Sequence, residues 1–446
     1  MTDSPLPANT PLESQSSLNE MRDVLRIRDF RLLWLGEGIS LLGDQFGFIA
    51  LPWLVLQLTG DALAMGLVLA IAGIPRALFM LFGGALTDRF SSRNLMLVTN
   101  LARMVLVSIL AATILGGFIQ LWMIYLFALL FGLADAFFYP AASAIVPTVV
   151  PKDQLEIGNS ITQGTAQLSV FVGPMLAGLL IALFAGTAEA EASTADLRGI
   201  GLAFVFDALT FLASAVTLAF MSDRRSAKTE EESSQSVWSA IGEGLQYVWQ
   251  DTTLRTVFIV VAALTMLGNA PIIIGVPVLA DERLPNGAAA FGILMSAYGA
   301  GSLIGIILSA LLPQPPQKWF GTLLFLAVTL MGLLMAALAF VYTLWLGITL
   351  LFLSGLIDGW VIIQFTTWLQ RRSPEKLLGR IMSLLMFAFV GLAPVADTII
   401  GGLIEWNLNA VLLICGSLLA LIALVAAFQA PIRAMGTAVT TEQQLT

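Results

Sequence analysis

The sequence contains no histidine and only one cysteine among its 446 residues. Without histidine, imidazole metal sites and imidazole proton relays are excluded, so any proton chemistry has to use carboxylates. The lone Cys415 cannot form an internal disulfide, and the apolar run around it indicates a thiol that faces the core or lipid. No phosphate-binding Gly-x4-Gly-Lys-Ser/Thr loop and no nucleophile–base constellation occurs. An ATP-driven pump and an enzyme are therefore both unsupported, and no cofactor or metal is implied.

Charge is scarce as well. Only 11% of the residues are charged and 58% are hydrophobic, whereas a soluble domain carries about 25% charged residues. A soluble protein of this length could not cover its surface with so few charges. Basic patches with interleaved aromatics are also lacking, so nucleic-acid binding has no support. The composition predicts an all-α membrane protein that crosses the bilayer many times.

Twelve runs are long enough to cross a bilayer, which takes about 20 residues each. We place them at 30–58, 62–86, 95–116, 119–147, 160–185, 199–221, 254–280, 288–312, 318–341, 343–368, 378–403 and 407–430. Residues 1–20 are polar and rich in proline and serine, with no apolar run that could act as a secretory signal. They predict a disordered cytoplasmic tail.

Lysine and arginine are distributed unequally between the two sides of these spans, which predicts the orientation. One side receives only Arg198 and Arg283. The other receives most of the basic residues, including Arg22, Arg26, Arg28, Arg31, Arg89, Arg93, Lys152, Arg224, Arg225, Arg371, Arg372 and Arg433. By the positive-inside rule the second side is cytoplasmic, and both termini lie there, as expected for a protein of the plasma or inner membrane.

The one sizeable polar stretch separates two groups of six spans. Residues 222–253 begin as a charged linker, and from about Ser236 apolar residues recur at helical spacing, which predicts an amphipathic helix on the inner membrane face. The predicted organisation is then a first bundle at 21–221, this linker, a second bundle at 254–431 and a cytoplasmic tail at 432–446.

The two halves share a pattern. Gly132, Leu133, Asp135 and Pro151 recur 223 residues later as Gly355, Leu356, Asp358 and Pro374. The triplet Leu-Gly-Asp at 42–44, followed by Pro52, recurs 225 residues later as Leu-Gly-Asn at 267–269, followed by Pro277. Two matches with nearly the same spacing indicate a duplicated six-helix unit. Parallel repeats of this kind place a binding site at their interface, near the bilayer midplane.

The loop after the second span reads GGALTDRFSSR at 83–93. It resembles the signature loop of the major facilitator superfamily, Gly-x-Leu-Ala-Asp-Arg-x-Gly-Arg-Arg/Lys, but departs from it at Ser91 and Ser92. The span count, the two halves and the central linker extend the resemblance over the whole chain. It implies a fold of two pseudo-symmetric six-helix bundles, a monomer and a cytoplasmic latch between the halves. The residues matching this latch are Gly84, Asp88, Arg89 and Arg93, with Arg380 at the start of span eleven as the candidate partner.

Two further stretches resemble exporters of that superfamily. FVGPMLAG at 171–178 is similar to the Gly-Pro motif of drug–proton antiporters, and the first span resembles the branch of macrolide-efflux and enterobactin-export proteins. Because proline removes a backbone donor, Gly173 and Pro174 predict a bend in span five, with Gly178 one turn further on. In the family this bend shapes the interface between the halves.

Several polar residues lie inside apolar spans. Asp44, Asp135 and Asp358 lie on spans that line the cavity in this fold, and Asn269 is expected opposite Asp44. A desolvated carboxylate can exchange protons near neutral pH, and Arg76 lies at a depth where it can pair with Asp135 or Asp44. Neutralising an aspartate would then release its partner and let the halves rock. The alternative is that the Asp–Arg pair only fixes helix packing, and that the repeated Gly-Leu-x-Asp is itself structural.

Arg103 in span three and Asp207 in span six belong to outer helices, and we expect them to form a structural buried pair. Asp397, later in span eleven, is a further candidate for the cavity. Because Arg76 and Arg103 are the only basic residues well away from the span ends, a cationic or neutral amphipathic compound fits the expected pocket better than an anion.

The sequence thus favours a secondary active exporter that exchanges protons for a drug-like or siderophore-like small molecule. Two alternatives stay open: an importer or uniporter on the same fold, and a non-transporting membrane receptor or assembly factor. The acids inside the spans argue against the last, because an idle scaffold has no need of them.

Overall fold

The structure is a computed structural model that describes residues 20–184, 192–222, 246–313, 315–373, 381–382, 384–433 and 435, without the side chains of 81–89, 192–196 and 387. Within these residues every regular element is helical. Twelve segments of the described chain are long and apolar enough to cross a membrane. The predicted all-α class and the predicted number of spans are therefore confirmed.

Within each half, the helices follow one another with short connections. The first half consists of α2 (Arg28–Thr59), α3 (Ala62–Arg89), α4 (Ser92–Leu115), α5 (Leu121–Val149), α6 (Leu155–Phe184) and α7 (Ala192–Ala219). In the second half, α9 (Thr252–Leu264), the π-helical turn η2 (Thr265–Asn269) and α10 (Ala270–Arg283) form one span. The others are α11 (Gly287–Leu311), α12 (Phe320–Ala337), α13 (Leu344–Arg372), η5 (Phe387–Gly391) with α15 (Ala393–Trp406), and α16 (Leu408–Ala427).

Only parts of the predicted tails and linker are described. The first tail lies outside the described residues except for residue 20, as do Ser236 and the rest of the linker from 223 to 245. Residues 246–250 are helical, with Val248 buried and Trp249 exposed. Asp251 then caps α9 by accepting hydrogen bonds from the amides of Thr253 and Leu254, and it pairs with Arg372 at 2.8 Å.

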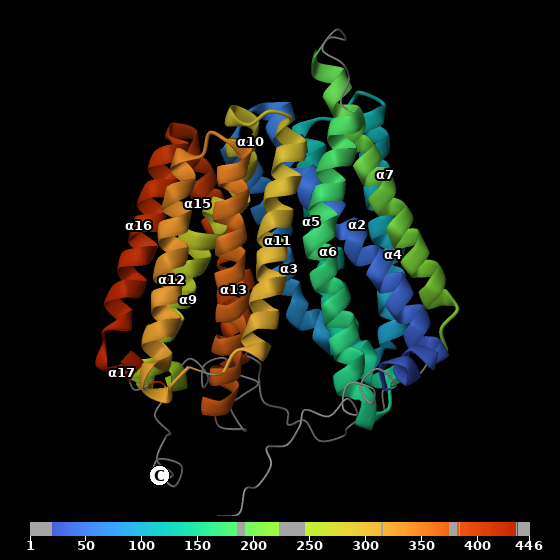
Figure 1. Cartoon of the computed structure of the whole chain (residues 1–446). Coiled ribbons are helices and arrows are strands. Elements are labelled where there is room, and N and C mark those ends of the chain that lie inside the picture. The colour runs from blue at the N-terminus through green and yellow to red at the C-terminus, as the bar shows by residue number, and fades with distance from the viewer. Residues whose placement is uncertain are drawn as a thin grey trace, which may run out of the picture.

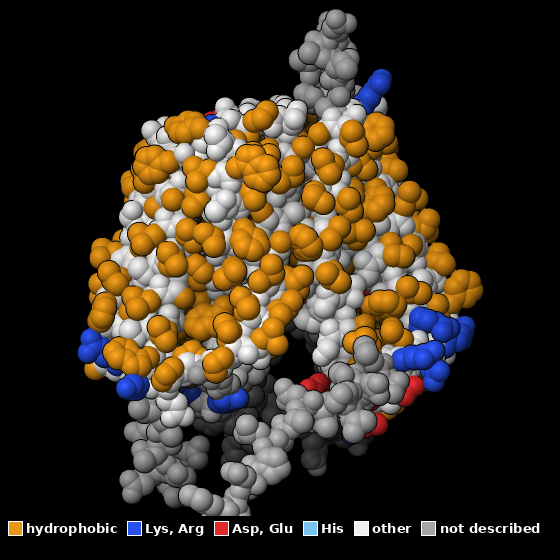
Figure 2. Space-filling view, viewed as in Figure 1, with side chains coloured by type: hydrophobic (Ala, Val, Ile, Leu, Met, Phe, Trp, Pro, Cys, Tyr) orange, Lys and Arg blue, Asp and Glu red, His pale blue; other side chains and the backbone are white. Residues whose placement is uncertain are grey.

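The two ends of the molecule differ in how the halves meet. We call the end where α2 begins and α16 finishes the basic end, and the opposite one the far end. In Figure 1 the helices of the two halves lie close together at the far end and spread apart toward the basic end, where Figure 2 shows an opening between them. The halves therefore enclose a cleft that opens at the basic end.

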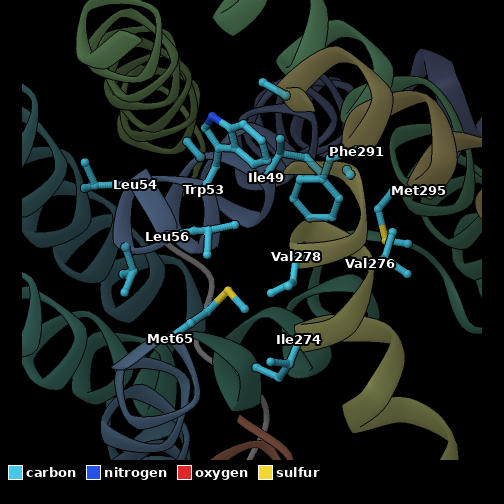
Figure 3. Close-up of a cluster of buried hydrophobic side chains, with 14 of the residues drawn as sticks. Ile49, Trp53, Leu54, Leu56, Met65, Ile274, Val276, Val278, Phe291 and Met295 are labelled. Atoms are coloured by element: carbon cyan, nitrogen blue, oxygen red, sulfur yellow. The ribbon is translucent and has the colours of Figure 1, made fainter. Parts of the chain in front are cut away.

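Hydrophobic packing follows the same division. At the far end one cluster joins the halves, with Ile49 and Trp53 of α2 beside Ile274 of α10 and Phe291 of α11 (Figure 3). The rings of Trp53 and Phe291 stack with their centroids 6.4 Å apart. Toward the basic end there are two separate clusters, one in each half. Among the described residues, the hydrophobic cluster that joins the two halves therefore lies toward the far end.

Glycine lets pairs of helices approach within each half. A Cβ added at Gly132 would overlap the backbone carbonyl of Ala72 in α3, and one at Gly355 would overlap the carbonyl of Tyr298 in α11. The repeated glycine therefore has the same structural cause in both halves: α5 crosses α3, and α13 crosses α11, at backbone contact. The Gly part of the repeat is structural, and its aspartate lies about one turn beyond each crossing.

This contact yields the first prediction. Gly132→Ala and Gly355→Ala force two backbones apart, and we expect each to destabilise the fold by about 1–3 kcal/mol, as overpacked cores are. Gly164→Ala is the matched control, since a Cβ there meets nothing within 4 Å and alanine is favoured over glycine in a helix by about 0.5–1 kcal/mol. Thermal unfolding of the purified protein in detergent measures all three. Equal midpoints for the three variants would contradict the tight crossings.

Candidate functional site

The first half carries a buried cation at its centre. Arg103 of α4 is 1% exposed, and its guanidinium is hydrogen-bonded to the Asp135 carboxylate of α5. The ring of Phe138 lies 3.8 Å from the guanidinium carbon, and further aromatic rings lie 5.6–5.9 Å away, those of Phe131, Tyr139 and Phe211. A cation needs such partners when it is removed from water, and aromatic faces supply part of the compensation.

The predicted pairing of Arg103 with Asp207 is wrong. Asp207 is 2% exposed, and its Oδ1 has no hydrogen-bond partner. The reason is the direction of the side chains. Arg103 lies against the face of α5 that carries Asp135, while the Asp207 carboxylate points at α2, where a Cβ on Gly43 would lie 2.7 Å from its Oδ1. Depth along the span does not reveal which face of a helix a residue occupies.

A second arginine approaches the same carboxylate. Arg76 Nη1 of α3 lies 3.8 Å from Asp135 Oδ2, and the Arg76 side chain is 32% exposed. Of the two predicted partners for Arg76, the geometry selects Asp135. Asp44 of α2 is half-buried and interacts electrostatically with Arg103 and Asp135. Two arginines therefore converge on one aspartate, with Asp44 beside them.

Sequence reasoning missed Glu37. Its Oε1 accepts a hydrogen bond of 3.0 Å from the Ser214 hydroxyl, which accepts one of 2.9 Å from the Asn100 amide. Glu37 precedes Asp44 by seven residues, which is two turns of α2, so both occupy one face. A glutamate inside an apolar run at that spacing was the available signal. With it, four carboxylates (Glu37, Asp44, Asp135 and Asp207) interact electrostatically with Arg103, and Arg76 approaches one of them, Asp135.

The second half differs in its chemistry. Asp358 of α13 is half-buried and its carboxylate faces the hydroxyl of Tyr298, not an arginine. Asn269 ends the π-helical turn η2 and is exposed. Asp397 of α15 is 6% exposed and its Oδ1 has no hydrogen-bond partner, with Arg76 of the first half as its charged neighbour. Among the described residues, no three His, Cys, Asp or Glu side chains are arranged to hold a metal ion.

The Gly-Pro bend lies at the interface of the halves. Past Pro174, the amide of Met175 donates a hydrogen bond of 2.8 Å to the Ser296 hydroxyl of α11. One turn on, a Cβ at Gly178 would lie 2.9 Å from the backbone of Gly292, so α6 and α11 touch there. At Gly173 a Cβ would meet the Gln45 side chain of α2 at 2.6 Å. The Gly-Pro segment thus packs α6 against α2 of its own half and against α11 of the second half.

The predicted latch is only partly visible. Gly84, Asp88 and Arg89 fall in the last turns of α3, whose side chains are outside the described part, and Arg380 lies outside the described residues. Arg93 donates hydrogen bonds of 2.7 and 2.6 Å to the carbonyls of Leu218 and Ala219, at the end of α7. A basic side chain at a helix C-terminus is stabilised there by the helix dipole. In this conformation Arg93 joins helices within the first half.

Comparison with known proteins identifies the class to which this architecture belongs. Residues 23–445 match the family described as "Transmembrane secretion effector". Among solved structures, the fold is similar to an inward-facing bacterial homologue of the iron transporter ferroportin, with a TM-score of 0.67 at 17% identity over 91% of this chain and all of that one. It is also similar to an inward-facing bacterial homologue of the lysosomal transporter Spinster, with a TM-score of 0.63 at 13% identity over 92% of this chain and 97% of that one.

The chain therefore belongs to the transmembrane secretion effector family of the major facilitator superfamily, and is a transporter and not an enzyme. Three relatives agree with the efflux branch. The multidrug efflux pump Tap of Mycolicibacterium fortuitum is 26% identical over 77% of this chain and 81% of its own. Macrolide efflux protein A of Streptococcus pyogenes is 23% identical over 86% and 93%. The enterobactin exporter EntS of Escherichia coli is 26% identical over 84% and 85%.

The aromatic enclosure of Arg103 gives the second prediction. Phe138→Leu removes the ring face that contacts the guanidinium, and Phe30→Leu makes the same change at a fully buried site away from Arg103. We expect Phe138→Leu to destabilise the protein by about 1–2 kcal/mol more than Phe30→Leu, which is the size of a desolvated cation–π contact. Thermal unfolding in detergent compares them. Equal losses would show that the ring contributes packing alone.

Proposed function

We propose that this transporter exports a cationic or neutral amphipathic small molecule, drug-like or siderophore-like, in exchange for protons. The observation that carries the proposal is the excess of carboxylates over arginines in the buried and half-buried cluster around Arg103. Four carboxylates against two arginines leave negative charge in a poorly solvated place, where binding a proton or a cationic substrate lowers the electrostatic free energy. The efflux relatives support the direction of transport.

Orientation and access fit this reaction. With the basic end in the cytoplasm, as the positive-inside rule indicates, both termini are cytoplasmic and the cleft takes up substrate from the cell interior. The protein would act in the plasma or inner membrane as a monomer. Parting of the far-end contacts and closure of the basic end would then release the substrate outside.

The acids have distinct parts in this scheme. Asp135 holds Arg103 and Arg76 when ionised, and a proton on it frees both arginines. Asp44, half-buried beside them, exchanges protons with the cleft. Asp358 and Asn269 of the second half bind substrate from the opposite side. An importer is the other candidate, but no feature of the described site favours inward transport.

Proton coupling is the third prediction. Everted membrane vesicles carrying a pH gradient and a pH-sensitive dye are screened with cationic and neutral amphipathic antibiotics and dyes. An active compound should dissipate the gradient in the wild type, and Asp44→Asn and Asp135→Asn should each abolish this flux because a neutral amide neither binds nor releases a proton. Asp153→Asn, an exposed acid in the η1 turn (Lys152–Gln154), serves as control. Full flux in both Asp44→Asn and Asp135→Asn would contradict the assignment of these two acids to proton coupling.

Alternating access is the fourth prediction. At the far end, Gln57 Nε2 donates a hydrogen bond of 2.9 Å to Asp281 Oδ1 across the halves. In a Cys415→Ala background, Gln57→Cys with Asp281→Cys should form a cross-link in the resting protein and stop transport, with recovery on reduction. Ser160→Cys with Leu311→Cys, on helices that diverge at the basic end (Figure 1), should cross-link poorly at rest. Transport by the cross-linked far-end pair would refute a rocking mechanism.

A further inference from the structure

A polar seam runs between α2 and α7 within the first half. The two helices approach so closely that a Cβ on Gly36 would lie 3.2 Å from the Ser214 backbone. Along α7 the polar residues recur at helical spacing on the face toward α2, at Asp207, Thr210, Ser214 and Thr217. The first three are buried, being 0–3% exposed. Such a stripe is unexpected inside a bundle, where apolar packing would be more favourable.

The facing side of α2 is polar as well. Glu37, Ser40 and Asp44 are separated by three and four residues and therefore share one face. The Ser40 hydroxyl is buried without a hydrogen-bond partner, and Glu37 receives its bond from Ser214. The two helices run in opposite directions, so Glu37 meets Ser214 toward the basic end, and Asp207 lies two turns deeper, beside Gly43. The side-chain oxygen atoms of these residues thus form a row that leads from the basic end to the middle of the first half.

The Asp207 carboxylate is incompletely hydrogen-bonded in this seam. Its Oδ1 has no hydrogen-bond partner, and the one cation among its neighbours, Arg103, is bonded to Asp135. The groups that act on Asp207 are Asp44 of α2, Arg103 of α4, Asp135 of α5 and Thr210 of its own helix. Besides the Thr210 hydroxyl, these neighbours are two further acids and an arginine already bonded to Asp135, which stabilise an ionised carboxylate poorly. The small ligand that such a group binds is a proton.

We propose that the α2–α7 seam is a proton-binding site in which Asp207 carries the proton and Glu37 connects it to the basic end. This inference rests on the proposed proton-coupled export and names a group that holds the proton. It replaces the structural role expected for Asp207 from the sequence with a functional one.

Arg103 links this site to the cleft. When Asp135 receives a proton, its bond to Arg103 weakens and the guanidinium turns to Asp207. The O–H bond of Asp207 then breaks, and the proton passes to the Asp44 carboxylate and, through the Ser40 hydroxyl between them, to Glu37, which releases it to water at the basic end. One proton enters at Asp135 and one leaves from Glu37, so the net charge of the half is the same before and after this step. The half resets when the proton on Asp135 moves to Asp207 and Arg103 bonds the Asp135 carboxylate again.

Infrared difference spectroscopy of the purified wild-type protein in lipid tests the site without any transport assay. A protonated carboxyl has a carbonyl stretch that an ionised carboxylate lacks. At neutral pH we expect one such band from a carbonyl without hydrogen-bond partners, absent in Asp207→Asn and shifted in Asp207→Glu. Asp153→Asn is the matched surface control and should leave the band unchanged. The Asp207→Glu variant retains the acid, so the shift identifies the band even if Asp207→Asn fails to fold.

Two results would overturn the inference: no such band in the wild type, or the same band at full intensity in folded Asp207→Asn. The outcomes separate this site from the proposed function. If the vesicle assay shows no proton flux while the band is present and is lost in Asp207→Asn, the export mechanism fails and the proton site stands. If flux is proton-coupled but the band persists in Asp207→Asn, the mechanism stands and the seam is structural.

Discussion

The shortage of positive charge around Arg103 is the constraint on which the chemistry of this protein depends. One guanidinium, removed from water and surrounded by aromatic rings, is bonded to Asp135 and acts on Asp44 and Asp207 as well. A buried ion pair is costly to form and costlier to break, because the remaining charge has no compensation. In the proposed mechanism, a proton on Asp135 redirects Arg103, because a second carboxylate, that of Asp207, lies within its electrostatic reach. Protonation would then change the partner of the guanidinium, which is how a small charge can bias a large motion.

The two halves repeat a backbone contact but not the chemistry beyond it. Gly132 and Gly355 both admit the carbonyl of a neighbouring helix. Past the crossing, Asp135 meets two arginines, whereas Asp358 meets the Tyr298 hydroxyl. The second half also contains the π-helical turns η2 and η5, which the described spans of the first half lack. Such turns often mark functional sites. The two halves thus share the backbone geometry of these crossings but differ in the polar contacts beyond them.

Sequence patterns predicted the architecture well because length and hydropathy are sufficient for it. The twelve spans follow from position along the chain, and so does the depth at which Arg76 can reach Asp135 or Asp44; the choice of Asp135 comes from the structure. The direction in which a side chain points does not. Arg103 and Asp207 lie on helices that do pack together, yet the arginine faces α5 and the aspartate faces α2. Glu37 has no polar counterpart in the second half, where Ala262 occupies the matching position, so the repeat does not single it out. For Asp88 and Arg380 the structure adds nothing, so the latch stays a prediction.

The bond from the Met175 amide to Ser296 joins a main-chain donor on one half to a side-chain acceptor on the other. Every amino acid except proline supplies the same donor at position 175, so the outward-facing part of that residue is free to vary. At position 296 only a side chain with a suitably placed acceptor will serve. Mutational tolerance across this joint should accordingly be one-sided: the side chain at position 175 of α6 can vary while α11 keeps its hydroxyl.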